Sequence, residues 1–470
     1  MVFSSVVFLF LFLPVTLAGY YLINEKFRNV FLLLMSVLFY AVGEPSFVFV
    51  MLLSIAANYG IGLLMWKTLD SKAVIRRLIL VLGVLVNLGI LFYYKYYDFT
   101  VSNINGLFGT SIALRNIALP IGISFFTFQG MSYTLDVYMK KASVQKNPLN
   151  VALYIALFPQ LVAGPIVRYS DINEQIDCRR ETLALFATGI YRFTFGLAKK
   201  VILSNTFATL ADTAFKMEPE ALSVGMAWLG AIGYSLQIYF DFSGYSDMAI
   251  GLGRMFGFRF NENFDHPYIA TGITDFWKRW HISLSTWFRD YIYIPLGGNR
   301  KGNVYFNIFV VFLVTGIWHG ASWNFVVWGL WHGFFRLLEL FLQKRNIKLG
   351  VPKPIKWIYT MLVVIVGWVL FRAPTLSSAV SYLKCMLGMG GVNANVESTL
   401  FHLLENLVIL IIGCVCTLPV VKWIKGLCEK HSRLELAKEL CLPVVNVVLM
   451  IVSVSLLLVT ENNPFIYFNF

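Results

Sequence analysis

The amino-acid sequence predicts an all-α, polytopic integral membrane protein. Of its 470 residues, 58% are apolar and 13% are charged, whereas soluble domains contain about 45–50% apolar and about 25% charged residues. The mean hydropathy is +0.70, and aromatic residues make up 16% of the chain. Lipid-facing helices with aromatic residues at both interfaces have this composition. It excludes a disordered chain, a disulfide-stabilised secreted domain and an ordinary soluble enzyme.

Long apolar runs predict about eleven transmembrane helices. The first, Val2 to Ile23, is too long for a signal-peptide core and has no cleavage pattern after it, so we expect a retained helix. The later runs are Val30–Val42, Phe47–Trp66, Leu78–Phe92, Ile117–Leu135, Leu183–Phe215, Leu222–Phe256, Phe306–Leu342, Ile355–Phe371, Leu400–Val421 and Leu442–Val459. Between them we expect a neutral loop over Asp98–Arg115.

The net charge of +13 follows the topology of these helices. Lys67, Lys72, Arg76 and Arg77 share one short loop, and the next basic loop contains Lys140 to Lys146. Cytoplasmic loops carry such an excess, so we expect these loops in the cytoplasm and the N-terminus outside. We therefore predict membrane lipids, and no nucleic acid, as partners of the charged surface.

Two segments interrupt the regular pattern. Val151 to Val167 is apolar but contains Pro159, Gly164 and Pro165, which suggests a re-entrant segment, because broken backbone at membrane depth is tolerated only inside protein or beside water. Asn261 to Lys301 is polar, aromatic and basic, and contains no clear span. No stretch is long enough to form a soluble domain, so we expect residues 1–470 to form a single membrane-embedded domain.

Ionisable groups at membrane depth are costly and mark candidate functional sites. His319 lies in the apolar motif Gly316-Ile317-Trp318-His319-Gly320. A neutral imidazole there can act as a base, although a histidine that only braces a helix bundle is an equal alternative. The same pattern recurs at His332, 13 residues later. On one unbroken helix the two rings would be about 220° apart, so we expect His332 to have a packing or interfacial role.

A third candidate is the aromatic and basic segment Phe276–Tyr291. Trp277, Trp280, Leu284 and Trp287 recur at helical spacing, which predicts one basic helix lying in the cytoplasmic membrane interface. His281, Ser283, Arg289 and Asp290 add polar groups that could receive an anionic substrate. The alternative for Arg289 and Asp290 is a structural ion pair.

The fourth candidate is Gln237–Asp247, which contains Asp241, Ser243 and Asp247 inside an apolar run. These groups must face the protein interior or water, and an internal hydrogen-bond network is the alternative to a binding site. No metal or bound cofactor is predicted, because the chain contains no His-Glu-x-x-His, Cys-x-x-Cys or Gly-rich phosphate loop. We expect the glycines in Gly251-x-Gly253 to serve helix packing.

Several of these motifs, taken in order, resemble the membrane-bound O-acyltransferase family and its bacterial polysaccharide branch. The motifs are Phe158-Pro159-Gln160-Leu161-x-Ala163-Gly164-Pro165, Tyr239-x-Asp241-Phe242-Ser243-Gly244-Tyr245-Ser246-Asp247, Trp280-His281-x-Ser283-Leu284-x-x-Trp287-x-Arg289-Asp290-Tyr291, Thr315-Gly316-Ile317-Trp318-His319-Gly320 and the terminal Phe465-Ile466-Tyr467-Phe468. The resemblance implies about eleven spans with re-entrant and interfacial helices around a central tunnel, and a catalytic core at about 120–342.

The resemblance also implies acyl transfer across a membrane. His319 would be the catalytic histidine in the tunnel and His281 the second one. Asp241, Ser243, Asp247, Trp280, Arg289 and Trp318 would line the substrate path. The donor would be a cytoplasmic thioester such as acetyl-CoA, or an acyl carrier. The acceptor would be a hydroxyl of an extracytoplasmic polysaccharide or of a periplasmic or extracellular acetyltransferase partner, at a bacterial inner membrane.

Two other functions stay open at this stage. One is D-alanyl transfer from a carrier protein to teichoic acid. The other is transport of an activated acyl group or glycan, although the paired broken helices of many transporters are not evident in the sequence. For the enzyme, we expect His319 to be more buried than His281 and to act as the base, while His281 holds or polarises the donor near the cytoplasm.

Overall fold

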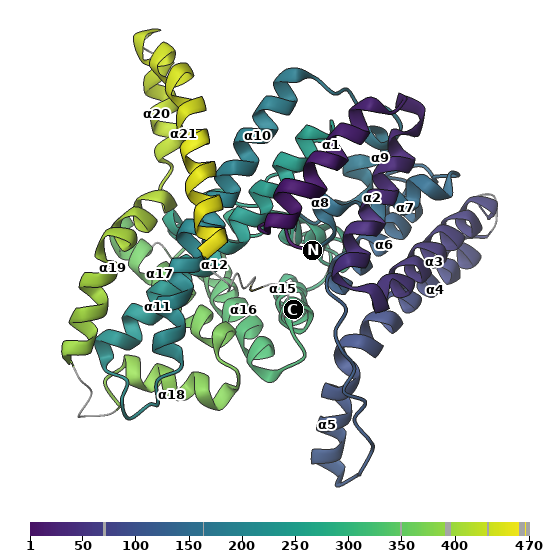
Figure 1. Ribbon diagram of the computed structural model, residues 1–470. Coiled ribbons are helices and arrows are strands. Elements are labelled where there is room, and N and C mark those ends of the chain that lie inside the picture. The colour runs from purple at the N-terminus through teal and green to yellow at the C-terminus, as the bar shows by residue number, and fades with distance from the viewer. Residues whose placement is uncertain are drawn as a thin grey trace. The chain divides into compact units, whose positions relative to one another are not determined.

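The computed structural model describes residues 1–68, 72–162, 164–347, 350–390, 396–429, 432–459 and 466, and the regular structure in these ranges is helical (Figure 1). Ala163, Phe465, Tyr467 and Phe468 of the sequence motifs therefore lie outside the described residues. Contacts divide the chain into two compact units that alternate along the sequence. Unit 1 comprises residues 1–193 and 245–261, and unit 2 comprises 194–244 and 262–466.

Unit 1 contains the helices of the first third of the chain. They are η1 (Phe8–Phe12), α1 (Leu13–Leu22), η2 (Glu25–Phe27), α2 (Arg28–Gly43), η3 (Pro45–Phe47), α3 (Val48–Lys67), α4 (Ala73–Leu91), η4 (Phe92–Tyr96), α5 (Tyr97–Phe108), α6 (Ile123–Tyr138), α7 (Pro148–Ala156), α8 (Phe158–Leu161), α9 (Tyr169–Asp177) and most of α10 (Leu183–Ala198).

Unit 2 contains most of the remaining helices, and α12 belongs to both units. The helices are η5 (Lys199–Ser204), α11 (Asn205–Phe215), α12 (Val224–Met255), η6 (Pro267–Ile269), α13 (Ile273–Arg279), α14 (Ile282–Phe288), η7 (Arg289–Tyr293), α15 (Val304–His319), α16 (Trp323–Lys344), α17 (Lys353–Arg372), α18 (Leu376–Met386), α19 (Val396–Thr417), α20 (Val420–Cys428) and α21 (Ser432–Val459).

Seven helical segments of the described chain are long and apolar enough to cross a membrane. They are Glu25–Gly43, Pro45–Lys67, Ala73–Phe108, Trp323–Lys344, Lys353–Arg372, Glu397–Thr417 and Glu435–Val459, and two shorter apolar helices cover Phe8–Leu22 and Val304–His319. The predicted polytopic, all-helical membrane protein is confirmed. Some of the other expected runs form helices such as α6, which is buried along nearly its whole length.

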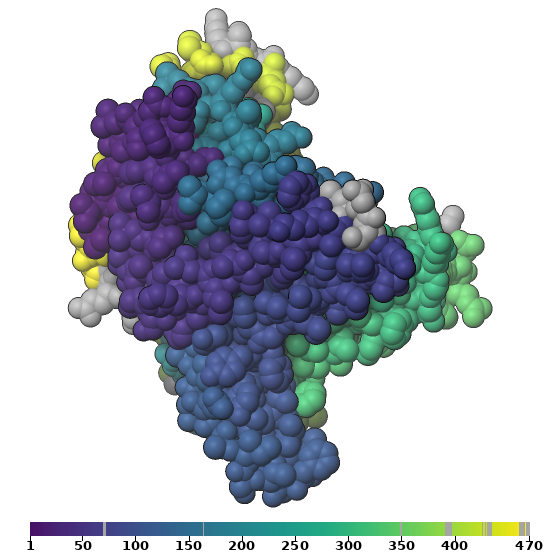
Figure 2. All heavy atoms as spheres, turned by 90° about the vertical axis from the view of Figure 1, so that its right-hand side faces the viewer, coloured from purple at the N-terminus to yellow at the C-terminus, as the bar shows by residue number. Residues whose placement is uncertain are grey.

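The segment from Asp98 to Arg115, expected to be a loop, is helical in its first half. The helical path that begins at Ala73 continues through a π-turn into α5 and ends at Phe108. Gly109 terminates it with a left-handed φ of 65°, a conformation that glycine adopts at little cost. Figure 2 shows this blue segment projecting beyond the purple helices of unit 1. The predicted loop was wrong because the Gly and Asn residues of this segment were taken as loop signals. Gly109 instead ends the helix.

The expected break near Pro159 is present. Helix α7 ends at Ala156, the short α8 begins at Phe158, and Gly164–Val167 is not helical. The described residues between Val151 and Val167 are almost all buried. The Gln160 side chain donates a hydrogen bond to the Tyr154 carbonyl at 2.5 Å, so its amide nitrogen finds a partner inside the broken segment, whereas its Oε1 is buried without a hydrogen-bond partner among the described residues.

Two buried asparagines join α3 and α4 in unit 1. The side-chain nitrogen of Asn58 donates to the oxygen of Asn87 at 3.0 Å, and Asn87 donates back at 2.9 Å. Thr134 on α6 donates to the same Asn58 oxygen at 3.1 Å. This reciprocal amide pair connects three helices, since lipid offers no alternative partner for an amide group.

Glycines allow the closest helix contact in unit 2. A Cβ atom on Gly329 would lie 2.5 Å from the Phe312 carbonyl oxygen and 3.0 Å from the Cα of Gly316. Helices α15 and α16 therefore touch backbone to backbone, as small residues permit in membrane proteins. In unit 1 the predicted packing role of Gly251 is confirmed, since its Cβ would lie 2.7 Å from the Gly189 oxygen.

We predict that Asn87→Ala destabilises unit 1, because it leaves the buried Asn58 amide with part of its hydrogen bonds unmade. The free energy of unfolding should fall by about 1–2 kcal/mol, measured by denaturant unfolding in detergent. Ser102→Ala, at an exposed position on α5, should leave stability unchanged. Equal stability of the two variants would contradict the bridging role of the asparagine pair.

Candidate functional site

The segment expected to be one interfacial helix is folded into the interior and broken at its centre. Helix α13 ends at Arg279, where the Trp280 backbone N–H donates to the Phe276 carbonyl at 2.8 Å, and α14 begins at Ile282. His281 between them has a φ of +45°. Trp280 and His281 are 1% and 0% exposed. The prediction of one continuous helix was therefore wrong, because it assumed unbroken helical spacing across this turn, and the interfacial location stays a prediction.

Asn263 holds the break in place from the loop 18 residues upstream. Its side-chain oxygen accepts hydrogen bonds from the Ser283 backbone N–H at 3.2 Å and from the Ser283 hydroxyl at 2.9 Å, and it lies 3.1 Å from His281 Nδ1. Its backbone oxygen accepts from the Ile282 N–H at 2.9 Å. The start of α14 is thus capped by a residue distant in sequence, since no side chain of its own N-cap forms a capping bond.

These bonds determine which nitrogen of His281 carries the proton. A backbone N–H can only donate, so the Asn263 atom that faces Ser283 must be its oxygen. His281 Nδ1 must then be the donor toward that oxygen, which leaves Nε2 of the neutral ring as an acceptor. Nε2 is buried and has no hydrogen-bond partner among the described residues. The arrangement therefore presents one acceptor nitrogen toward the protein interior.

His319 lies beside this turn at the end of α15. Its ring centroid is 4.9 Å from that of Trp318, which is 6.4 Å from that of His281. Trp328 and Phe371 pack against His319 at centroid distances of 4.8 and 5.2 Å. His281 and His319 thus both contact the indole ring of Trp318, among other aromatic side chains.

Both histidines are buried, which differs from the expected order. His319 is 3% exposed and His281 is fully buried, so the expectation that His319 is the more buried ring is wrong. Burial lowers the pKa of His281, which lies outside the candidate spans, well below its usual range. His281 is therefore a neutral ring at physiological pH.

His332 lies much closer to this cluster than the helix-phase argument suggested. The turn at Gly320–Ser322 separates α15 from α16, so the two histidines stand on different helices. Trp328 contacts both, at 4.8 Å from His319 and 5.2 Å from His332. His332 is fully buried among aromatic rings that include Trp277 and Trp368, which agrees with a packing role.

The polar segment of α12 supplies buried ion pairs in each unit. In unit 2, Lys200 Nζ lies 2.6 Å from Asp241, and both side chains are almost fully buried. The other oxygen of Asp241 accepts a hydrogen bond from the Ile466 backbone N–H at 2.8 Å. In unit 1, Asp247 accepts from Arg192 Nε at 2.8 Å. The segment therefore contains the internal network that was weighed against a binding site.

The remaining candidates are placed as follows. Ser243 is buried, and its hydroxyl has no hydrogen-bond partner among the described residues. Arg289 has a side chain 58% exposed and pairs with Asp290 at 2.7 Å, as the structural alternative predicted. Trp280 packs against Trp368 at 4.7 Å. The structure thus gathers His281, His319, Trp280 and Trp318 in unit 2, while Arg289 faces outward.

The loop that carries Asn263 is itself anchored by charge. Asp265 accepts a hydrogen bond from Lys422 Nζ at 2.6 Å, and this ammonium group holds the pKa of Asp265 below its usual value. His266 Nδ1 lies 3.1 Å from the Thr417 carbonyl oxygen, and burial lowers its pKa. His266 therefore helps to fix the loop against the end of α19.

Three contributors to the site were not singled out from the sequence. Asn263 orients His281, Phe242 packs its ring edge-to-face on His281 at 4.6 Å, and Trp368 closes the enclosure. Asn263 could have been found only as a polar residue in the irregular segment before His281. Within the described part of the chain, no three His, Cys, Asp or Glu side chains gather as metal ligands would.

We predict that Asn263→Ala lowers stability more than Ser283→Ala does. The first change removes the acceptor of three interactions and the second removes one hydroxyl, so unfolding free energies should fall by about 2–3 and about 1 kcal/mol. Denaturant unfolding of both purified variants measures the difference. Equal losses would contradict the central position of the Asn263 oxygen.

We also predict that Lys200→Met destabilises unit 2, because Asp241 then stays buried without its cation. Breaking one partner of a buried pair costs about 3–5 kcal/mol. The double variant Lys200→Met with Asp241→Leu should recover most of that loss, since no buried charge remains. Unfolding measurements on both variants test this, and a single variant as stable as the wild type would contradict it.

Comparisons with known proteins agree with the arrangement of these motifs. The family model for MBOAT, the membrane-bound O-acyltransferase family, matches residues 123–382. The chain is 47% identical to the probable alginate O-acetylase AlgI of Pseudomonas aeruginosa, over 83% of this chain and 75% of that protein. It is 36% identical to the peptidoglycan O-acetyltransferase of Helicobacter pylori, over 84% and 81%, and 32% identical to the teichoic acid D-alanyltransferase of Bacillus subtilis, over 53% and 66%. The chain is therefore an O-acyltransferase and belongs to the membrane-bound O-acyltransferase family.

Proposed function

We propose that this protein transfers an acetyl group from a cytoplasmic thioester donor to hydroxyls of an extracytoplasmic cell-surface polysaccharide. The relatives named as O-acetylases match more than four-fifths of the chain, whereas the D-alanyltransferase matches about half of it. This difference favours acetyl over D-alanyl as the transferred group. We place the protein in a bacterial cell membrane, because each of these relatives is bacterial and the chain is a multi-pass membrane protein.

The observation that carries the proposal is the burial of His281 and His319 with both rings next to Trp318. Burying two imidazole groups among aromatic rings costs free energy, so their presence there favours a function. Acyl transfer to a hydroxyl needs a group that takes the hydroxyl proton and an environment that excludes water. His281 and His319 are 0% and 3% exposed. An imidazole enclosed by aromatic rings can take the hydroxyl proton and is shielded from water, so the arrangement supports both requirements.

In the proposed step His319 is the general base. Its neutral ring takes the proton of the acceptor hydroxyl as that oxygen bonds to the thioester carbonyl carbon. The carbon–sulfur bond then breaks, and the proton on His319 passes to the departing thiolate. The acceptor becomes an ester, the donor becomes a free thiol, and His319 returns to its neutral form.

The tautomer of His281 determines which hydrogen bond this ring can form with a substrate. Because Nδ1 donates to Asn263, Nε2 can accept a hydrogen bond but cannot donate one to a thioester carbonyl. We therefore propose that His281 holds an N–H or O–H group of a substrate, such as an amide of a pantetheine-type thioester arm, and does not polarise the carbonyl. The sequence analysis expected His281 either to hold the donor or to polarise its carbonyl. The tautomer now favours holding the donor.

The competing proposal of a transporter predicts a different product. In proteoliposomes with radiolabelled acetyl-CoA outside and acceptor oligosaccharide inside, a transferase yields labelled oligosaccharide and free coenzyme A. Intact donor inside the vesicles would instead indicate transport. Supplying a D-alanyl carrier protein as donor in the same assay tests the alternative acyl group.

We predict that His319→Ala lowers the transfer rate by about 10²–10⁴-fold, the usual cost of losing a general base. The rate is measured per folded protein with labelled donor. His332→Ala should retain the rate within about tenfold, because His332 packs and does not meet the substrate. An alanine variant at position 319 with nearly full transfer would refute its assignment as base.

For His281→Ala we expect weaker donor binding together with slower turnover, because the acceptor nitrogen Nε2 is lost. In His319→Ala, donor affinity should remain within about twofold while transfer stops. Isothermal titration of a non-transferable thioether analogue of the donor into each variant decides between the roles. If His281→Ala keeps both affinity and rate, His281 only braces the turn.

A further inference from the structure

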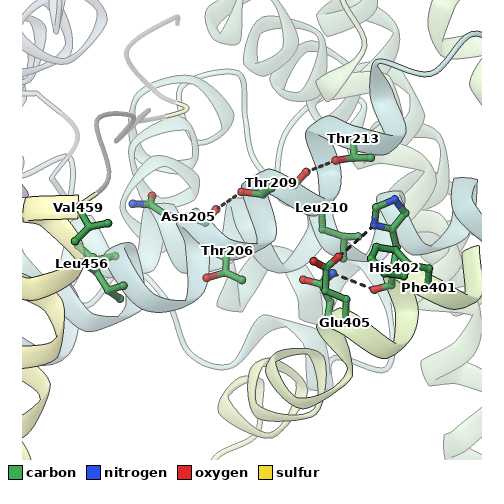
Figure 3. Close-up of a pocket in the computed structure, with 12 residues that line it drawn as sticks. Asn205, Thr206, Thr209, Leu210, Thr213, Phe401, His402, Glu405, Leu456 and Val459 are labelled. Atoms are coloured by element: carbon green, nitrogen blue, oxygen red, sulfur yellow. Dashed lines mark hydrogen bonds and ion pairs between the residues drawn. The ribbon is translucent and has the colours of Figure 1, made fainter. Parts of the chain in front are cut away.

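A groove of about 880 Å³, lined by both polar and apolar side chains, lies in unit 2, away from the histidine cluster, among α11, α19 and the end of α21. Figure 3 shows Asn205, Thr206 and Thr209 along one wall and His402 with Glu405 on the facing helix. Leu456 and Val459 line the groove from α21. His402 Nδ1 and Glu405 lie 3.4 Å apart within the candidate span Glu397–Thr417, so two ionisable side chains occur in an apolar helix there.

The wall formed by α11 presents hydrogen-bond acceptors. Each threonine hydroxyl donates to the carbonyl four residues earlier, at 2.7 Å for Thr206, 3.4 Å for Thr209 and 2.9 Å for Thr213. The single proton of each hydroxyl is thereby used, and its oxygen keeps acceptor capacity. On α19, the Asn406 side chain donates one N–H to the His402 carbonyl at 2.9 Å. The ionised Glu405 carboxylate can only accept hydrogen bonds. A ligand of this groove must therefore bring many donors.

The charge of the loops places this groove toward the extracytoplasmic side. Between α19 and α21 the sequence contains Lys422, Lys425 and Lys430, and Arg433 and Lys438 follow in the first two turns of α21, whereas the connection before α19, residues 387–396, contains no Lys or Arg. The positive-inside rule puts the basic connection in the cytoplasm. The start of α19, with His402 and Glu405, and the end of α21, with Val459, then lie toward the opposite face.

Val201 and Asn205 line the groove where η5 passes into α11. Lys200, which precedes Val201 in the sequence, pairs with Asp241 at 2.6 Å, and Phe242, which follows Asp241, packs on His281 at 4.6 Å. The helices that line the groove therefore pack, on another face, toward the residues around His281.

We propose that this groove binds an uncharged, hydroxyl-rich stretch of a glycan chain. Sugar hydroxyls are donors and acceptors at once, so they match a wall of threonine oxygens and a carboxylate. The groove volume is within the range of sites for ligands of several hundred daltons. The inference rests on the proposed function, in which such a chain is the acyl acceptor, and it adds a place where the acceptor is held before a hydroxyl reaches the histidines.

A phospholipid is the main competing occupant. Its phosphate oxygens only accept hydrogen bonds, and they would face the Glu405 carboxylate and the acceptor oxygens of α11. This mismatch favours the glycan. An ammonium headgroup could still supply donors, so the test distinguishes a bound lipid from a bound oligosaccharide.

The test measures binding of cellohexaose, an uncharged oligosaccharide, to the full chain in lipid nanodiscs by saturation-transfer NMR titration. The wild type should show saturable binding. Thr206→Val with Thr209→Val keeps the shape of both side chains and removes both oxygens, so the Kd should rise about tenfold or more. Thr209→Phe fills the groove without removing packed atoms and should give the same loss if the double variant folds poorly.

Thr188→Val is the matched control, because this exposed threonine on α10 also donates its hydroxyl to its own helix, at 3.0 Å to Leu185. It should leave the Kd unchanged. Absence of saturable wild-type binding, or an unchanged Kd in both groove variants, overturns the proposal. Native mass spectra in which the groove variants lose a bound phospholipid, with no cellohexaose binding, assign the groove to lipid and also overturn it.

Acetyl transfer measured in the same preparations separates this inference from the proposed function. Transfer without cellohexaose binding overturns the groove assignment and leaves the proposed function standing. Binding that depends on Thr206 and Thr209, in preparations that transfer no acetyl group to any polysaccharide, supports the groove and overturns the proposed function.

Discussion

The hydrogen bonds accepted by the Asn263 side-chain oxygen are the interaction on which the candidate site depends. One oxygen caps the start of α14, stabilises the left-handed backbone at His281 and sets the tautomer of its ring. These effects depend on one another, because the His281 ring can donate to Asn263 only if the chain breaks between α13 and α14. The loop that carries Asn263 is fixed in turn by Asp265, which binds Lys422. A polar group that cannot reach water thus organises the chemistry around it.

The need to pair buried polar groups also accounts for other contacts in both units. Inside a membrane every buried polar group must find a partner in the protein. In unit 1 this produces the reciprocal Asn58–Asn87 pair, and in unit 2 it produces the Lys200–Asp241 pair with its hydrogen bond from Ile466. Glycines such as Gly316 and Gly329 bring helix backbones into contact where side chains would prevent it. His281 Nε2 and both ring nitrogens of His332 are among the buried atoms of the described residues that have no hydrogen-bond partner, and at His281 a bound substrate would supply one.

The sequence allowed the fold class, the family and the histidine motifs to be predicted, because apolar runs and short motifs are local properties. The break at His281 could not be predicted, since its cap comes from Asn263 in a loop 18 residues away. The phase argument for His332 failed because Gly320–Ser322 forms a turn between two helices. Asp98–Arg115 was expected to be a loop because its Asn and Gly residues resemble turn signals, although they occur along and after a helix. Lys200 was not recognised as a partner of Asp241, since an ion pair between distant helices leaves no periodic signal.

We propose that the substrate reacts in the aromatic enclosure that contains His281 and His319. A structure by electron cryomicroscopy with a non-transferable thioether analogue of acetyl-CoA tests this directly. We expect density for the acyl end beside Trp318, within hydrogen-bond distance of His281 Nε2 or of the His319 ring. Density for the analogue only on the outer surface near Lys278 and Arg289, with the enclosure unchanged, would contradict the account.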